Sequence, residues 1–181
     1  MGSQHLLMSK RFPFNSILYQ YLRPRFVYES IHDIDFQLLR SDGIRSLFFD
    51  VDNTIIKYKE TGVSLKSMTL FNAIASHGFD HIILISNNSS VERIEHVSKQ
   101  LNLPAVTFAC KPFVFTMRRL LNDYKIDVSQ AALIGDQLFT DVLLANVTGM
   151  SSIYVEPIDI SNISFLKRAQ YKLQQSIFNS F

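Results

Sequence analysis

Residues 44–54 read Ile-Arg-Ser-Leu-Phe-Phe-Asp-Val-Asp-Asn-Thr, a short apolar run that ends on two aspartates. The run lacks the polar alternation of a strand with one face in water, so it is typical of a strand covered on both faces. Asp50 and Asp52 stand where this strand ends, and the turn that follows can direct both carboxylates into one pocket. The segment therefore predicts a buried strand that carries reactive groups at its carboxyl end.

Four further apolar runs, over residues 81–86, 106–109, 131–135 and 153–155, have the same character. Between them, apolar residues spaced three or four apart predict helices over residues 65–75, 91–101 and 113–124. Ser64 and the pair Ser89-Ser90 stand where N-cap residues are expected for the first two helices. Strands that alternate with helices indicate right-handed crossovers, so we expect an α/β fold around a mostly parallel sheet.

Polar side chains stand at the ends of the predicted strands, namely Asp50, Ser86, Lys111 and Asp136. Ligands of parallel α/β sheets bind at this edge, so we expect the four side chains to share one site. The carboxylates of Asp50, Asp52 and Asp136 form an all-oxygen set that suits Mg²⁺. The Lys111 ammonium and the Ser86 hydroxyl, with nearby main-chain N–H groups, suit the oxygens of a phosphate. The combination predicts phosphoryl transfer by positioning and charge neutralisation.

The doublet of Asp50 and Asp52 is only moderate evidence by itself, because Asp-x-Asp-x-Thr is equally compatible with a capped turn. The complete set follows in the order Asp50-x-Asp52-x-Thr54, Ser86-Asn87, Lys111-Pro112 and Gly135-Asp136 with Asp141. Each motif falls at the end of a predicted strand. One active site explains this order better than several unrelated turns do.

The ordered set resembles the four motifs of the haloacid dehalogenase (HAD) superfamily, subfamily IIIA, over residues 44–156. The resemblance implies a Rossmann-like, three-layer sandwich with a mostly parallel, five-stranded sheet. It also implies that Asp50 is the nucleophile that forms an aspartyl-phosphate, and that Asp52 acts first as general acid and then as general base. Superfamily dehalogenases lack the second aspartate of the first motif, so Asp52 favours phosphate chemistry.

The same resemblance assigns roles to the remaining motif residues. Those that would bind the phosphoryl group are Thr54, Ser86, Asn87 and Lys111, the last with a catalytic role as well. Those that would hold Mg²⁺ are Asp50 through its carboxylate, Asp52 through its main-chain carbonyl, and Asp136, with Asp141 in support. The expected cofactor is Mg²⁺, although Mn²⁺ also prefers oxygen ligands and stays open.

The spacing between the motifs leaves no room for a cap domain over the site. Asp52 and Ser86 are separated by enough chain for a short hairpin, over residues 54–62, and one helix. Ser86 and Lys111 are separated by enough for one helix and one strand. Phosphatases for small metabolites usually enclose their substrate and exclude water. An uncapped site suits a phosphate on a protein, a nucleic-acid end or a lipid, unless a second copy of the chain supplies a lid.

A closer resemblance, over residues 24–158, is to the YqeG-like phosphatases. It rests on Pro-Arg-Phe-Val-Tyr-Glu-Ser-Ile at residues 24–31, Ser-Asn-Asn-Ser at 86–89 and Gly-Asp-Gln-Leu-Phe-Thr-Asp-Val at 135–142. That family is related to the mitochondrial and plastid phosphatidylglycerophosphate phosphatases, which implies hydrolysis of a phosphomonoester on a lipid. The alternatives are a phosphoprotein, nucleic-acid-end or small-molecule phosphatase with the same site, and a catalytically silent binding module.

Length and composition predict a single domain, because 181 residues with 47% hydrophobic content supply one buried core. We expect an amphipathic lead-in over residues 1–43 that packs on the core, the phosphatase core over 44–158 and a C-terminal helix over 159–181. The net charge is +4 over residues 1–27, −4 over 28–156 and +2 over 157–181. Cationic ends around an acidic middle favour an anionic surface over a nucleic-acid groove as partner.

Both ends of the chain have apolar residues at helical spacing beside basic residues. The apolar positions are Phe14, Ile17, Leu18, Tyr21 and Leu22 near the N-terminus, and Leu166, Ala169, Leu173 and Ile177 near the C-terminus. Such helices either pack on the core of their own domain or lie on a membrane surface. The sequence leaves both interpretations open, and it does not predict the oligomeric state.

The expected location is cytoplasmic, with contact to a membrane surface and without secretion. No apolar run reaches the ~18 residues of a membrane span, and the N-terminal region lacks the apolar segment of a secretory signal. Cys110 is the single cysteine, which excludes an internal disulfide. Because free cysteines are usually buried, we interpret Cys110 as a packing residue rather than as a nucleophile.

Overall fold

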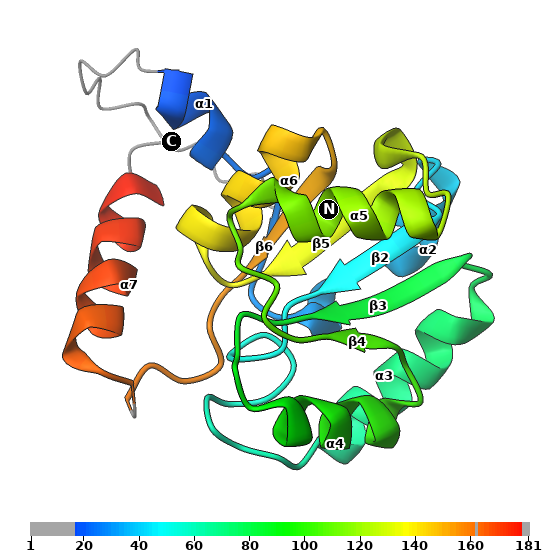
Figure 1. Ribbon diagram of the computed structural model, residues 1–181, viewed down its shortest axis with the longest axis horizontal. Coiled ribbons are helices and arrows are strands. Elements are labelled where there is room, and N and C mark those ends of the chain that lie inside the picture. The colour runs from blue at the N-terminus through cyan, green and yellow to red at the C-terminus, as the bar shows by residue number, and fades with distance from the viewer. Residues whose placement is uncertain (1–16, 162, 179–181) are drawn as a thin grey trace, which may run out of the picture.

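The computed structural model describes residues 17–161 and 163–178, which form a three-layer α/β structure (Figure 1). Within these residues the sheet has six strands in the order β1-β6-β5-β2-β3-β4, and every neighbouring pair is parallel. The strands are β1 (Phe26–Tyr28), β2 (Ser46–Phe49), β3 (His81–Ile85), β4 (Ala105–Val106), β5 (Ala131–Gly135) and β6 (Ser151–Val155). The predicted Rossmann-like parallel sheet is confirmed.

Helices cover both faces of this sheet. They are α1 (Ile17–Leu22), α2 (Phe36–Ser41), α3 (Leu65–Ser76), α4 (Val91–Leu101), α5 (Val114–Asp123), α6 (Leu143–Thr148) and α7 (Phe165–Phe178). Leu47 and Phe49 of β2 belong to a buried cluster with residues of α2, α3 and α4. Phe48 belongs to a second cluster, formed with α5 and α6. Successive side chains of β2 thus enter opposite apolar layers, which is why its sequence is apolar throughout.

The sheet has one strand more than the five that the sequence predicted. The additional strand, β1, lies within the segment predicted as a lead-in, and it pairs with β6. Three residues at the edge of a sheet are too few for a periodic apolar pattern, and the middle one, Val27, is 47% exposed. The segment predicted as a lead-in therefore contributes a strand to the core sheet.

Three local predictions are wrong. Strand β4 ends at Val106 instead of residue 109, because Phe108 and Cys110 have φ angles of 50° and 54°, which extended strands do not contain. Cys110 is exposed rather than buried, since it lies in the irregular loop between β4 and α5. The hairpin expected over residues 54–62 is absent, because a single bridge between Asp52 and Ile56 is followed by turns.

The residues that the structure describes form no cap domain over the carboxyl edge of the sheet, as predicted. The connection from β2 to α3 covers residues 50–64, and the connection from β3 to α4 covers residues 86–90. Neither contains a further helix or strand. Helix α7 instead stands beside this edge of the sheet (Figure 1).

Of the apolar positions predicted for α7, Ile177 packs against a buried cluster, but most of the helix contacts the domain through other residues. Its buried residues are Tyr171 and Gln174, whereas Leu166 and Leu173 are 79% and 56% exposed. At the other end of the chain, Leu22 of α1 is buried in a cluster with Leu138, and the predicted apolar position Phe14 lies outside the described residues. Among the helices that the structure describes, none has the length and apolar content needed to cross a membrane.

Candidate active site

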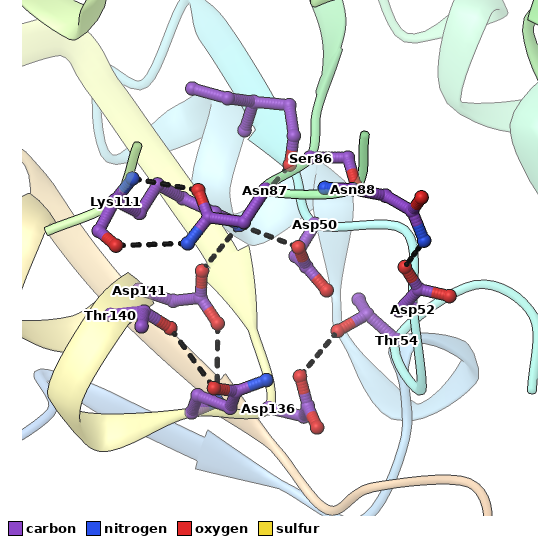
Figure 2. A network of polar contacts seen from close by, with 12 residues as sticks. Asp50, Asp52, Thr54, Ser86, Asn87, Asn88, Lys111, Asp136, Thr140 and Asp141 are labelled. Atoms are coloured by element: carbon purple, nitrogen blue, oxygen red, sulfur yellow. Dashed lines mark hydrogen bonds and ion pairs between the residues drawn. The ribbon is translucent and has the colours of Figure 1, made fainter. Parts of the chain in front are cut away.

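Three neighbouring strands carry the predicted motif residues to one edge of the sheet. Asp50 follows β2, Ser86 follows β3 and Asp136 follows β5, and β2 lies between the other two strands. Lys111 reaches the same place from the loop before α5 (Figure 2). Asp141 comes from a π-helical turn directly after β5, a geometry that is frequent at functional sites.

Asp50, Asp136 and Asp141 form a buried carboxylate cluster. One carboxylate oxygen from each lies within 4.8 Å of the other two. Their exposed fractions are 5%, 0% and 1%, so water screens their mutual repulsion poorly. The Oδ2 atom of Asp50 is buried and has no hydrogen-bond partner among the described residues. Three oxygen donors, one of them unsatisfied, fit a divalent cation such as Mg²⁺.

Lys111 is the cation that this cluster already contains. Its Nζ atom lies 2.5 Å from Asp50 Oδ1 and 2.6 Å from Asp141 Oδ1, and it donates to the Ile85 carbonyl over 3.1 Å. Asn87 fixes the Lys111 backbone on both sides. It donates from Nδ2 to the Lys111 carbonyl over 2.8 Å and accepts from the Lys111 N–H at Oδ1 over 2.7 Å.

Burial changes the acid–base behaviour of the cluster in the metal-free protein. Burial raises the pKa of Asp50 to about 7, although Lys111 opposes the shift. Burial, and then the charges of Asp50 and Asp141, raise the pKa of Asp136 well above its ordinary value. Burial by itself would lower the pKa of Lys111, but Asp141 and Asp50 outweigh that effect and raise it. A bound dication would therefore favour the ionised forms of Asp50 and Asp136 near neutral pH.

Asp52 lies apart from the carboxylate cluster and is held by Arg93 of α4. The Arg93 Nη2 atom lies 2.5 Å from Asp52 Oδ1, and Nη1 donates to Oδ2 over 3.4 Å. Asn88 Nδ2 donates to the same Oδ2 over 3.0 Å, and Arg93 Nε donates to the Glu60 carbonyl over 2.7 Å. These contacts orient the carboxylate predicted to act as acid and base. Sequence reasoning missed Arg93, because a single basic residue on a helix carries no motif.

A cavity of about 320 Å³ opens over Asp50. Its lining residues are Asp50, Asp52, Tyr58, Asn87, Asn88, Ser89, Lys111, Gln137, Thr140 and Lys167. None of these is an aliphatic hydrocarbon side chain, and the volume is at the lower end of the range for small-molecule sites. The cavity therefore suits a small polar group rather than an acyl chain.

The three predicted phosphate-binding residues besides Lys111 have different surroundings. Ser86 is buried, and its Oγ accepts from the Asn88 N–H over 3.0 Å. The Asn87 amide is occupied by the Lys111 backbone, so a contact with phosphate would come from its main chain. Thr54 is absent from the cavity lining, and its hydroxyl donates to Asp136 Oδ1 over 3.4 Å. Direct contacts of these side chains with a phosphoryl group stay a prediction.

Helix α7 supplies two site residues that the sequence did not indicate. The Tyr171 hydroxyl donates to Asp136 Oδ2, and burial, followed by the charge of Asp136, raises the pKa of this tyrosine. Gln174 Nε2 donates to the Asp136 carbonyl, and Gln174 Oε1 accepts from the Leu138 N–H, each over 2.7 Å. The sequence shows only a tyrosine and a glutamine three positions apart, and the apolar pattern of the helix gave no reason to select them.

Gly135 leaves the space that Asp141 occupies. A Cβ atom added at Gly135 would lie 2.5 Å from Asp141 Oδ2 and 2.6 Å from Asp141 Cβ, which is closer than these atoms can approach. We expect Gly135→Ala to displace Asp141, to lower the free energy of unfolding by about 1–3 kcal/mol and to weaken divalent-cation binding by about tenfold or more. Denaturant unfolding and a Mg²⁺ titration measure the two effects.

Gly62→Ala is the matched control for this substitution, because nothing lies within 4 Å of a Cβ atom added there. We expect Gly62→Ala to leave both stability and cation binding near their wild-type values. If the two alanine variants behave alike, the close approach at Gly135 does not determine the position of Asp141.

Comparison with known proteins relates the site to a phosphatase family. A family model described as mitochondrial PGP phosphatase matches residues 15–159. The chain is 25% identical over 164 residues to the probable phosphatase YqeG of Bacillus subtilis, with 91% of this chain and 94% of that protein covered. It is 29% identical over 127 residues to the probable mitochondrial phosphatidylglycerophosphatase of Schizosaccharomyces pombe, with 62% of this chain and 59% of the yeast protein covered.

The eukaryotic relatives are longer than this chain. The match to the chloroplastic/mitochondrial phosphatidylglycerophosphate phosphatase 1 of Arabidopsis thaliana is 20% identical over 168 residues, and it covers 87% of this chain but 47% of the plant protein. The chain thus spans about half of the plant relative and nearly all of the bacterial one.

Two solved structures share the fold. A crystal structure of an uncharacterised protein from Listeria monocytogenes superposes with a TM-score of 0.53 at 14% identity, with 71% of this chain and 99% of that chain covered. The 3-deoxy-D-manno-octulosonate 8-phosphate phosphatase of Yersinia pestis gives a TM-score of 0.50 at 13% identity, with 81% and 85% covered. At these identities the likeness concerns the fold alone.

Proposed function

This chain belongs to the mitochondrial PGP phosphatase family, and from that premise we propose that it removes the terminal phosphate of phosphatidylglycerophosphate. It is a phosphatase of the HAD type. The observation that supports its chemistry best is Asp50 at the cavity, with Lys111 on one oxygen and the other oxygen buried and unsatisfied. The relatives described as phosphatidylglycerophosphate phosphatases support the substrate.

The proposed reaction has two steps. One carboxylate oxygen of Asp50 attacks phosphorus, and Asp52 donates a proton to the leaving oxygen of the glycerol, which leaves a phosphoryl group on Asp50. Asp52, now ionised and oriented by Arg93, removes a proton from the water that hydrolyses the aspartyl-phosphate. The Lys111 ammonium offsets the negative charge of the phosphoryl oxygens.

Mg²⁺ is the proposed cofactor. Asp50, Asp136 and Asp141 would hold it, together with the main-chain carbonyl of Asp52, and it would supply positive charge that offsets the negative charge of the phosphoryl group. Tyr171 and Thr54 both donate to Asp136, so they would keep its carboxylate in place for the ion.

The titration of the carboxylate cluster predicts how stability depends on pH. A carboxyl group whose pKa rises on folding stabilises the protein at low pH, and this contribution is lost as the pH passes upward through the folded-state value. The pKa of Asp50 in the folded protein is about 7, and the pKa of Asp136 is also raised. We therefore expect the metal-free protein to melt at a lower temperature at about pH 8 than at about pH 5.5.

Mg²⁺ should remove this dependence, because the ion binds the ionised carboxylates of the folded protein and so stabilises it most at the higher pH. Differential scanning calorimetry in EDTA and in Mg²⁺ at both pH values measures the effect. Asp50→Asn is the control, since it should lose part of the pH dependence in EDTA. A metal-free melting temperature that rises from the lower to the higher pH would contradict the prediction.

The proposed function is tested by phosphate release from phosphatidylglycerophosphate in mixed micelles with Mg²⁺. p-Nitrophenyl phosphate and a phosphopeptide are the comparison substrates, and Asp50→Asn is the inactive control. Preferred, Asp50-dependent hydrolysis of the lipid is the expected result. Asp50-dependent hydrolysis of the comparison substrates alone would retain the phosphatase chemistry and remove the lipid assignment. A chain whose biological activity survives Asp50→Asn would be a binding module.

Contact with a membrane surface is part of the same proposal. Phe165, Leu166 and Leu173 of α7 are 83%, 79% and 56% exposed, and the exposed Arg168 and Lys172 lie on the same helix. A short-chain, monomeric form of the lipid tests this contact, because it should be hydrolysed more slowly than the micellar form. The cytoplasmic location stays a prediction, since the eukaryotic relatives are described as mitochondrial or chloroplastic.

A further inference from the structure

Two of the residues that line the cavity over Asp50 have no part in the proposed reaction. Tyr58, from the chain that follows β2, and Lys167, from the first turn of α7, both line it. The Lys167 Nζ atom lies 4.0 Å from the centroid of the Tyr58 ring. Position 167 lies beyond residues 15–159, which the family model matches.

Lys167 differs from the other lysine of the cavity in its partners. Lys111 is paired with two carboxylates, Asp50 and Asp141. Lys167 makes no ion pair with the described acidic residues, and the Tyr58 ring is the partner of its ammonium group. A cation on an aromatic face keeps the charge available for an anion, because the ring carries no net charge. The cavity thus has one neutralised and one available ammonium group.

The position of Lys167 is set by the same contacts that attach α7 to the site. Lys167, Tyr171 and Gln174 are spaced i, i+4 and i+7, so they lie along one face of the helix. Tyr171 and Gln174 of this face are hydrogen-bonded to Asp136. The same face therefore directs Lys167 toward the cavity, which agrees with its place in the lining.

Resting on the proposed function, we infer that Lys167 and Tyr58 form a second anion subsite, which binds the phosphodiester of the substrate while its phosphomonoester lies on Asp50. Phosphatidylglycerophosphate has two phosphates joined by a glycerol. In this arrangement Lys111 would face the phosphomonoester and Lys167 the phosphodiester. The polar lining accommodates this headgroup, and the acyl chains stay outside. Lys167 is in this respect a residue that determines specificity rather than one that takes part in bond breaking.

Lys167→Gln tests the inference by its different effect on two substrates. Loss of a charge-assisted contact should raise KM for phosphatidylglycerophosphate about tenfold or more, with kcat little changed, because the contact is made equally in the bound and transition states. Hydrolysis of p-nitrophenyl phosphate, which has no second anion, should be unchanged. Lys167→Arg should restore most of the affinity, since it keeps the charge.

Lys99→Gln is the matched control, because Lys99 is an exposed residue of α4 that does not line the cavity, and the substitution makes the same change in net charge. It should leave KM for both substrates near wild type. An equal rise of KM in Lys167→Gln and Lys99→Gln would assign the effect to general charge and overturn the subsite. So would equal losses on both substrates in Lys167→Gln, which would indicate a displaced α7.

A second readout keeps the subsite separate from the identity of the lipid substrate. Glycerophosphoglycerol carries the diester phosphate without a monoester, and it should inhibit hydrolysis of p-nitrophenyl phosphate by the wild-type enzyme. Lys167→Gln should raise its inhibition constant about tenfold, and Lys99→Gln should not. If this inhibition depends on Lys167 while phosphatidylglycerophosphate is not hydrolysed, the proposed substrate fails and the subsite stands. If inhibition is absent or independent of Lys167, the subsite is overturned.

Discussion

Replacing Asp50 with Asn is expected to lower kcat for phosphate release by roughly 10⁴-fold or more, the size of effect that follows removal of a nucleophile. Asn keeps the shape of Asp but has no anionic oxygen that can attack phosphorus. The neighbouring carboxylates should not replace Asp50 as nucleophile, because Asp136 accepts a hydrogen bond from Tyr171 and Asp52 is ion-paired with Arg93. Steady-state hydrolysis of p-nitrophenyl phosphate in saturating Mg²⁺ measures the loss.

The fold of Asp50→Asn should be retained, since the substitution removes a buried charge and leaves Lys111 paired with Asp141. Circular dichroism and the melting temperature check this point. Asp123→Asn is the control for activity, because that carboxylate is 59% exposed on α5 and should tolerate the change without loss. An Asp50→Asn enzyme with a substantial fraction of wild-type kcat would exclude the aspartyl-phosphate mechanism.

Asp52→Asn separates the two chemical steps. p-Nitrophenolate leaves without a proton, so this variant should still transfer the phosphoryl group to Asp50, but it lacks the base for hydrolysis. Phosphorylated Asp50 should then accumulate, and mass spectrometry of an acid-quenched digest detects it. Absence of the phosphopeptide in both the wild type and Asp52→Asn would argue for direct attack of water on the substrate.

Lys111→Met is expected to destabilise the metal-free protein by about 3–5 kcal/mol, the usual cost of removing one partner from a buried ion pair. Asp50 and Asp141 are 5% and 1% exposed, and without the ammonium group their charges would face each other in a site that water does not screen. Urea unfolding in EDTA measures the loss. Lys99→Met, at an exposed position of α4, should change stability by no more than about 0.5 kcal/mol.

A second substitution tests whether the loss comes from uncompensated charge. Asp141→Asn added to Lys111→Met removes one of the two unpaired carboxylates, so the double variant should regain part of the lost stability. Lowering the pH should also restore part of the lost stability of Lys111→Met. Burial raises the pKa of Asp50, so this carboxylate is readily protonated and loses its unpaired charge. If the double variant is less stable by the sum of the two single effects, Lys111 stabilises the site through packing instead of charge.

Local runs of apolar residues were sufficient to predict most strands of the sheet. The strands β2, β3 and β5 were predicted within a residue or two, because a strand covered on both faces is apolar at nearly every position. Strand β1 was missed, since three residues at a sheet edge produce no such run. Strand β4 was predicted too long, because apolar residues continue into a loop where Phe108 has a positive φ.

The local sequence pattern could not predict the side chains that support the site. Arg93 contacts Asp52 across 41 positions of sequence, and Tyr171 contacts Asp136 across 35. Neither residue belongs to a motif or repeats at a characteristic spacing. Their contacts depend on how α4 and α7 are placed against the sheet, which no short stretch of sequence encodes.

By itself, the sequence determined that Asp50, Asp136 and Lys111 converge, because the carboxyl ends of parallel strands and the loops beyond them meet at one edge of a sheet. The tertiary structure alone decided what surrounds them: Arg93 on Asp52, and α7 against Asp136 with Lys167 at the cavity. The physical reason is the distance along the chain over which each feature is encoded. A buried strand is a local run of apolar residues, so the sequence shows where it ends. Contacts between layers depend on how whole helices pack against the sheet, and only the folded chain brings those distant segments together.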